Sequence, residues 1–111
     1  LCCDTPGIPE NESVTKQGAG VGLNVMDGAA IVDLELLEQF EVLARRKKIS
    51  AQRTLLHRGG TDAGTMQRAG SGVRVMTLLT PTRYIHTVTE TVHKNDLHAS
   101  RDLLAAFLEQ V

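Results

Sequence analysis

The chain has 111 residues, a formal net charge of -1 at pH 7, 41% hydrophobic residues and 23% charged residues. This length argues for one domain, and the balanced charge argues against partners that recognise a strong field, such as nucleic acid or an anionic membrane surface. No run approaches the roughly 20 apolar residues of a membrane helix, and no signal sequence opens the chain. We therefore expect a cytoplasmic protein without a nucleic-acid or membrane partner.

The N-terminal residues predict the end of a strand followed by a turn. The opening apolar residues stop at Asp4-Thr5-Pro6-Gly7, where Pro fixes φ and Gly permits a reversal. Cys2 and Cys3 are adjacent and cannot close a useful loop or form a metal site alone, so we expect buried thiols in a reducing compartment. Because the chain begins inside a strand, we expect a fragment. The polar residues 9–20 predict an exposed connection.

Hydrophobic periodicity predicts a strand and then a helix in the first half of the chain. Residues 21–26 alternate apolar with small or polar side chains, and Asp27-Gly28 then turns the chain. Asp33 is placed to cap a helix that runs to about Lys47. The basic residues 45–48 suit the negative end of that helix dipole. A solvated helix end explains them best, with anion binding as the alternative.

The second half continues the alternation of strands and helices. We expect a strand over residues 53–57, a short helix over 63–69, a strand over 73–79, an irregular segment over 81–90 and a short strand over 91–93. Asn95 is the expected cap of a last helix. Its apolar face is expected to contain Leu97, Leu104, Phe107, Leu108 and Val111. This order predicts an α/β fold, in which ligand sites gather on loops beyond the strand ends.

A glycine-rich loop over residues 58–64 is the first candidate site. Its paired glycines let backbone N–H groups approach a ligand, and Asp62 lies at the expected start of a helix. A strand-to-helix turn capped by Thr61 or Asp62 explains the loop equally well, so both interpretations stay open here.

The second candidate is His86, in the segment that follows an expected strand. A neutral imidazole is a zinc ligand, but its spacing alone does not show that it binds metal. The other histidines, His57, His93 and His98, have no nearby ligand pattern and are expected to be surface or packing residues. The sequence lacks a Gly-x-Ser-x-Gly elbow, a phosphate-binding P-loop and an obvious pair of catalytic carboxylates.

Three segments, in order along the chain, resemble one enzyme family. Asp4-Thr5-Pro6-Gly7 resembles a D-x-P-G turn, residues 59–64 a G-G-T-D-A-G loop and residues 81–87 a P-x-R-Y-I-H-S/T segment. These motifs are similar to those of tetrahedral (TET) and glutamyl aminopeptidases, metallopeptidase family forty-two. Residues 87–90 and Asp96-Leu97 resemble the downstream continuation, so the resemblance spans essentially the whole chain. Arg74 and Val88 stand where the family often has Pro.

The resemblance implies a cytosolic peptidase that uses two zinc or cobalt ions to remove N-terminal residues from peptides, often as a tetrahedral dodecamer. It implies that His86 stands at the family's last metal-ligand histidine and that Gly60, Thr61 and Asp62 lie beside the first residue of the substrate. His57 and Arg58 would lend positive charge to the specificity pocket, although a solvated loop explains them as well.

The resemblance also implies what lies outside the chain. The other metal ligands and the general base would precede Leu1, so residues 1–111 correspond to the C-terminal part of a three-layer α/β/α phosphorylase/hydrolase-like catalytic domain. We expect no catalytic residue in the chain. One His cannot hold two metals, so the chain alone should be inactive.

Three expectations complete this interpretation. The exposed sheet edge of such a piece predicts a homo-oligomer. One alternative is a non-catalytic remnant or interaction module on the same scaffold. A less favoured alternative is a parent endoglucanase, which needs two flanking carboxyl groups that nothing in this sequence places.

Overall fold

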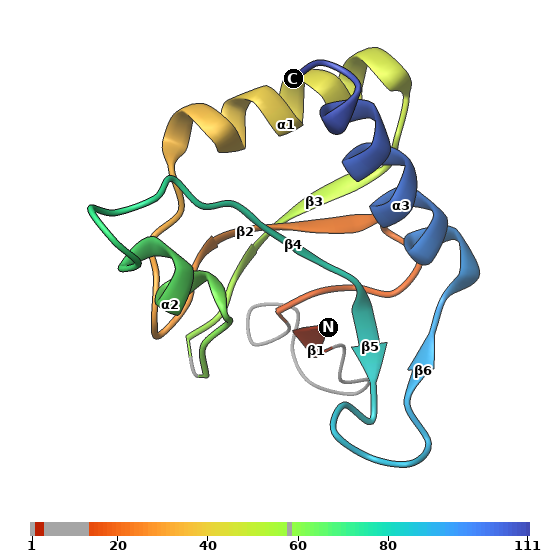
Figure 1. Ribbon diagram of the computed structural model, residues 1–111. Helices are drawn as coiled ribbons and strands as arrows, with labels where there is room; N and C mark the ends of the chain where they lie inside the picture. The colour runs from red at the N-terminus through yellow and green to blue at the C-terminus, as the bar shows by residue number, and fades with distance from the viewer. Residues whose placement is uncertain (1, 4–13, 58) are drawn as a thin grey trace.

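The computed structural model describes residues 2–3, 14–57 and 59–111, in which two small sheets are combined with helices (Figure 1). The first sheet contains β2 (Val21–Met26), β3 (Ala51–Leu55) and β4 (Thr77–Leu79), and the second contains β1 (Cys2–Cys3), β5 (Pro81–Arg83) and β6 (Thr91–Val92). The helices are α1 (Leu34–Lys47), α2 (Ala63–Gln67) and α3 (Lys94–Leu108). This mixture confirms the predicted α/β class.

Strand β2 is the centre of the first sheet. It runs parallel to β3, with Val21 opposite Ala51, and antiparallel to β4, with Gly22 opposite Leu79. Helix α1 joins the parallel pair β2 and β3, because parallel strands need a long crossover connection. Only Thr80 separates β4 from β5, so the chain passes directly into the second sheet, where β5 is parallel to β1 and antiparallel to β6.

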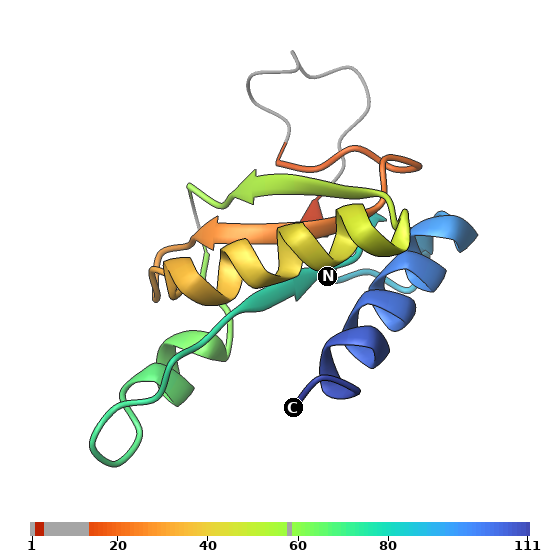
Figure 2. The same ribbon diagram turned by 90° about the horizontal axis from the view of Figure 1, so that it is seen from above.

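The main hydrophobic core lies between α1, α3 and β2. Its buried members are Val21, Leu23, Val32, Leu37, Phe40, Leu43, Ala44, Ala99, Leu103 and Ala106. The rings of Phe40 and Phe107 stack with their centroids 4.3 Å apart, which joins the two helices. Figure 2 shows α1 in front of β2, with α3 beside it. Apart from Phe40, the buried members of this core are aliphatic.

The predicted helix after Asp33 is confirmed as α1. A carboxylate oxygen of Asp33 accepts a hydrogen bond from the Leu36 backbone N–H at 3.0 Å, which caps the first turn. The helix ends at Lys47, and the next residue, Lys48, has a φ of 56° and donates its backbone N–H to the Arg45 carbonyl. Basic side chains occupy the last turn, as predicted from the helix dipole.

Strand β3 begins and ends two residues earlier than the predicted strand over 53–57. Its start is fixed by pairing, because Ala51 lies opposite Val21 at the beginning of β2. Ala51 and Gln52 are neither β-branched nor aromatic, so by themselves they gave no strand signal. His57 therefore lies beyond the strand and is exposed, as predicted for a surface residue.

The strand predicted over residues 73–79 is wrong except for its last three residues, which form β4. The preceding residues instead contact the start of α1. The Val75 carbonyl accepts the Asp33 backbone N–H at 3.0 Å. The Arg74 guanidinium donates to both carboxylate oxygens of Asp33 at 2.8 Å and to Glu35 at 2.9 Å. These bonds replace the ladder that a longer strand would need.

Two segments are more ordered than predicted. The prediction of an irregular segment over 81–90 is wrong for its first three residues, which form β5 because β1 supplies a partner from far earlier in the chain. Within the predicted exposed connection over 9–20, Thr15 and Gly20 are buried. Gly20 has a φ of 98°, and a Cβ there would lie 2.0 Å from the Ser50 carbonyl oxygen, so glycine is required.

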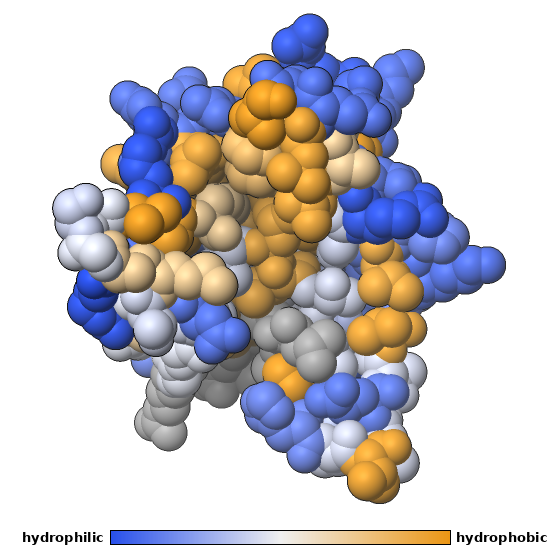
Figure 3. Space-filling view, in the orientation of Figure 1, coloured by the Kyte–Doolittle hydropathy of each residue, from blue (hydrophilic) through white to orange (hydrophobic). Residues whose placement is uncertain are grey.

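Helix α3 is turned differently from the prediction. Its N-cap is His93 rather than Asn95, because His93 Nδ1 accepts the Asn95 backbone N–H at 3.2 Å. The side chains that face the core are Asp96, Ala99, Leu103 and Ala106. Leu97, Leu104, Leu108 and Val111 are exposed, so the predicted face is wrong at these four residues, whereas the half-buried Phe107 packs against the core as predicted. In Figure 3 apolar surface forms a band down the middle of the view, between α2 and α3.

Asp96 explains the orientation of α3. Its carboxylate is fully buried and accepts backbone N–H groups from Gly18 at 2.7 Å and from Gly20 at 2.8 Å. A buried carboxylate needs such partners, so this polar residue turns toward the sheet and apolar neighbours turn outward.

Several predictions fall on residues that the structure does not describe. The turn Asp4-Thr5-Pro6-Gly7, the side chains of Cys2 and Cys3, and Arg58 lie outside the described part. Within the described part, no helix has the length and apolarity needed to span a membrane.

Candidate functional site

The glycine-rich loop lies between β3 and α2, and its two polar side chains have different surroundings. Thr61 Oγ1 donates a 2.7 Å hydrogen bond to Asp27 Oδ2, at the end of β2. Asp62 is the residue before α2, but its exposed side chain makes no capping hydrogen bond. Asp62 is thus the N-cap residue of α2, as the structural interpretation predicted, but neither its side chain nor that of Thr61 makes the capping hydrogen bond. Helix α2 ends at Gln67, two residues before the predicted end.

Asp27 is the centre of a buried polar network. From the sequence, Asp27 and Gly28 were predicted only to form a turn. One carboxylate oxygen accepts the backbone N–H groups of Ala29 at 2.7 Å and Ala30 at 2.9 Å. The other accepts from Thr61 and from the side-chain amide of Asn24 at 3.3 Å. Asn24 in turn accepts from the hydroxyl of Thr54 on β3 at 3.2 Å. The network joins the ends of β2 and β3 to the glycine-rich loop.

The charge of Asp27 is stabilised by these donors. Burial of the side chain opposes ionisation, but hydrogen bonds from the Thr61 side chain and from the backbone of Ala29, Ala30 and Thr61 hold the pKa of Asp27 below its ordinary value of 3.8. An Asp at a strand end, followed by the small residues Gly28, Ala29 and Ala30, is typical of a carboxylate that bonds the next backbone N–H groups. That signal was available in the sequence.

The two loops approach each other at glycine positions. The Gly28 backbone N–H donates to the Gly59 carbonyl at 2.8 Å, and a Cβ on Gly28 would lie 2.6 Å from that oxygen. Added Cβ atoms on Gly60 and Gly64 would lie 2.8 and 2.5 Å from the Cβ of Ala29. Glycine is therefore required by packing at these positions, and not only by turn geometry.

A cavity of about 480 Å³ lies beside this loop. Thr61, Asp62 and Met66 line one part of it, and residues 73–79 line another. Its volume falls in the range of small-molecule clefts, about 300–1,000 Å³. Among the described residues, the hydroxyl of Thr77 in its lining is a buried polar group with no hydrogen-bond partner. The cavity thus combines the acidic side chain of Asp62, the basic side chain of Arg74 and apolar side chains.

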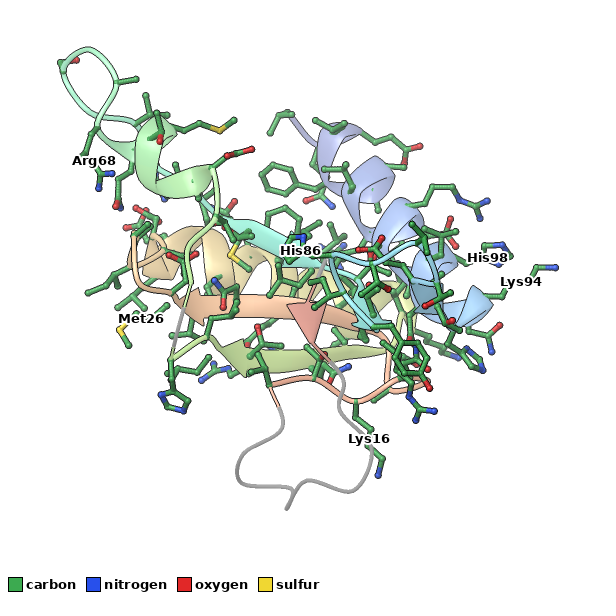
Figure 4. The ribbon with its side chains drawn as sticks, turned by 90° about the horizontal axis from the view of Figure 1, so that it is seen from below. Lys16, Met26, Arg68, His86, Lys94 and His98 are labelled. Atoms are coloured by element: carbon green, nitrogen blue, oxygen red, sulfur yellow. The ribbon has the colours of Figure 1, made fainter. Side chains whose placement is uncertain are left out.

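His86 lies on a different loop, the connection between β5 and β6. Tyr84 and His86 both adopt positive φ values, 55° and 64°, which non-glycine residues rarely do. The loop is bonded within itself. The His86 backbone N–H donates to the Glu90 carboxylate at 2.6 Å, and the Thr87 hydroxyl donates to the Tyr84 carbonyl. The side chain of His86 is exposed. Figure 4 shows it in the middle of the lower face of the molecule.

A complete metal site does not form from the part of the chain that the structure describes. No group of three or more His, Cys, Asp or Glu side chains there lies close enough to hold a metal ion. The exposed imidazole of His86 can be one ligand, but a zinc site generally needs at least three protein ligands. The residues present therefore do not fit a di-metal centre by themselves. His93 is used as a helix cap, in agreement with its predicted structural role.

Comparisons with known proteins extend these observations. The family model of M42 glutamyl aminopeptidase matches residues 1–103. The chain is 30% identical to FrvX of Escherichia coli (strain K12) over 105 residues, which is 95% of this chain and 30% of that protein. This chain therefore spans less than a third of the curated relative's length.

Two solved structures show the same fold. A TET aminopeptidase from a marine sediment Thaumarchaeota archaeon is 29% identical, with a TM-score of 0.93 over 100% of this chain and 31% of that one. The Pyrococcus horikoshii TET1 peptidase, which can assemble into a tetrahedron or a large octahedral shell, is 26% identical. Its TM-score is 0.79 over 96% of this chain and 30% of that one.

Proposed function

This chain belongs to the M42 glutamyl aminopeptidase family, and on that premise we propose that it forms the C-terminal part of an aminopeptidase that hydrolyses N-terminal residues from peptides. The observation that carries the proposal is the similarity of the whole described fold to that of a TET aminopeptidase, with a TM-score of 0.93. The similarity extends over both candidate loops. The proposal therefore concerns a larger protein in which this chain is one part.

The glycine-rich loop is proposed to contact the first residue of the substrate. Gly60, Thr61 and Asp62 lie along its turn into α2, and Thr61 and Asp62 line the adjoining cavity of about 480 Å³. A cleft of this kind suits a single amino-acid side chain. Arg58, in the same loop, is a less favoured candidate for contact with the substrate.

His86 is proposed as one ligand of a di-metal site. The M42 peptidases are metallopeptidases. The exposed side chain of His86 supports a ligand role, and the remaining ligands would have to come from outside the described residues. Two divalent ions, zinc or cobalt, are the proposed cofactors, and such ions activate water at neutral pH when they are bound. We infer that this chain alone does not catalyse hydrolysis, since it would hold at most part of that site.

The ligand role of His86 is tested by His86→Gln in the full-length enzyme. Aminopeptidase turnover and bound metal per subunit should both fall, whereas the matched change His57→Gln, at another exposed histidine, should leave bound metal unchanged. Retained turnover with a full complement of metal would contradict the assignment.

The inactivity of the chain is tested directly. The purified 111-residue chain is assayed on a panel of aminoacyl-nitroanilides with added zinc and then with cobalt. We expect no turnover. Turnover that a chelator abolishes would mean that the missing ligands are supplied otherwise.

Assembly and location follow as further proposals. Because the P. horikoshii relative assembles into a tetrahedron or an octahedral shell, we propose that the protein containing this chain is a cytoplasmic homo-oligomer that acts on peptides. Sedimentation of that protein would test the assembly, and a monomer at working concentration would contradict it.

A further inference from the structure

The strongest unassigned feature is the buried carboxylate at the end of β2. Asp27 is 6% exposed, and each of its two oxygens accepts two hydrogen bonds. Two of these donors belong to its own turn, at Ala29 and Ala30. Buried carboxylates require donors, but a turn alone would not require the bond to Thr61, which lies 34 positions along the chain.

We propose that Asp27 is a positioning residue that fixes the glycine-rich loop through Thr61. The proposal rests on the proposed function, in which this loop contacts the substrate. The Thr61 hydroxyl bonds Asp27 and so holds the position of the loop, while the exposed Asp62 lines the cavity. Asp27 acts on the loop and has no assigned contact with substrate.

The surrounding contacts agree with this role. The bond from Gly28 to the Gly59 carbonyl holds the same two loops together at a second point. The close approach of Ala29 to Gly60 and Gly64 holds them at a third. Two side chains at the end of α2 add hydrogen bonds. Gln67 donates to the Ile31 carbonyl at 2.8 Å, and Arg68, the residue after the helix, donates to the Ala29 carbonyl at 3.1 Å. The turn after β2 is therefore a platform for the loop and for α2.

Charge supports the assignment independently of packing. The groups that bond the Asp27 carboxylate are neutral: a hydroxyl, a side-chain amide and backbone N–H groups. An ionised acceptor makes stronger hydrogen bonds than a neutral one. The hydroxyl of Thr61 thus has one strong acceptor, which selects a single orientation of the loop.

The test is residue-resolved amide hydrogen exchange on the full-length protein that contains this chain. The reporting amides are those of Thr61, Gly64, Thr65 and Met66, and the amides of α1 serve as the internal reference. Thr61→Val removes the hydroxyl and keeps the shape, Thr61→Ser restores the hydroxyl, and Asp27→Asn removes the charge. Thr54→Val is the matched control, because it deletes a buried hydroxyl of the same network that bonds Asn24 instead of Asp27.

We expect Thr61→Val and Asp27→Asn each to speed exchange at the reporting amides by roughly tenfold or more relative to α1, as loss of a hydrogen bond to a charged group implies. Thr61→Ser and Thr54→Val should leave these amides near the wild-type rate. The double variant of Asp27 and Thr61 should show less than the additive effect of the two single variants, because both changes act on the same hydrogen bond.

Three outcomes would overturn the proposal. They are equal acceleration in α1 and the loop, failure of Thr61→Ser to restore protection, and additive effects in the double variant. If Asp27→Asn does not fold, the comparison of the three threonine variants decides alone. Exchange is measured without turnover, so its result is separate from the tests of the aminopeptidase function.

Discussion

The two loops proposed to form the site are held in opposite ways. The glycine-rich loop is fixed from beneath by the buried carboxylate of Asp27 and by close packing against Ala29. The loop that carries His86 is exposed and is bonded mainly within itself, from Tyr84 to Glu90. In Figure 1 the first loop connects β3 to α2, and the second loop connects β5 to β6.

The difference shows that the two loops are held in place by different kinds of interaction. Packing and a charged acceptor determine the first loop inside this chain, so its geometry should depend on core substitutions. The second loop has positive φ values at Tyr84 and His86 and is held by hydrogen bonds of its own, from His86 to Glu90 and from Thr87 to Tyr84. Substitutions should therefore affect folding strongly at the first loop and weakly at the second.

The largest expected effect is that of Gly64→Ala. Alanine normally stabilises a helix relative to glycine, but here its Cβ would lie 2.5 Å from the Ala29 Cβ and 2.8 Å from the Ala29 carbonyl oxygen. We expect the free energy of unfolding to fall by about 2–3 kcal/mol. Urea unfolding followed by far-ultraviolet circular dichroism measures it.

Gly59→Ala is the matched control for that change. Gly59 has a φ of 82°, but nothing lies within 4 Å of an added Cβ, so only backbone strain of about 1–2 kcal/mol is expected. If Gly64→Ala destabilises the chain no more than Gly59→Ala, the close contact with Ala29 does not constrain the loop.

Acid should weaken the hydrogen bonds that Asp27 makes to the first loop. The pKa of Asp27 is lowered in the folded state, so its hydrogen bonds contribute stability above the ordinary value of 3.8, and that contribution is lost as pH falls through the folded pKa. Unfolding measured between pH 6 and pH 3 should show a steeper loss in wild type than in Thr61→Val. Equal pH slopes in the two proteins would contradict this contribution.

A second carboxylate provides the comparison for the acid experiment. Hydrogen bonds from the Arg74 side chain and the Leu36 backbone hold the pKa of Asp33 below 3.8. Its contribution has the same sign but lies at the start of α1. Asp33→Asn should therefore reduce the acid dependence of α1 exchange while leaving the acid dependence at Thr61 unchanged.

The smallest expected effect is that of His86→Ala on folding. The side chain is exposed, so the free energy of unfolding should change by no more than about 0.5 kcal/mol. Glu90→Gln, which weakens the acceptor of the His86 backbone N–H, should be equally mild and should speed exchange of that amide alone. A change above 1 kcal/mol in either variant would show that this loop is braced by the core after all.

The sequence determined the local elements. Alternation over residues 21–26 and the cap at Asp33 identified β2 and α1, because backbone periodicity and capping depend on nearby residues. The three ordered motifs identified the family and the fold class. The candidate residues Gly60, Thr61 and Asp62 on the glycine-rich loop, and His86 on the second loop, were also found from the sequence.

Only the tertiary structure decided how those elements are paired and turned. The bounds of β3 and β5 depend on partners elsewhere in the chain, and the buried face of α3 depends on Asp96 bonding to Gly18 and Gly20. The bond between Asp27 and Thr61 likewise joins residues 34 positions apart. Such contacts leave no periodic signal, because hydrogen bonds to buried charges are selected by the packed arrangement of the whole chain and not by their immediate neighbours.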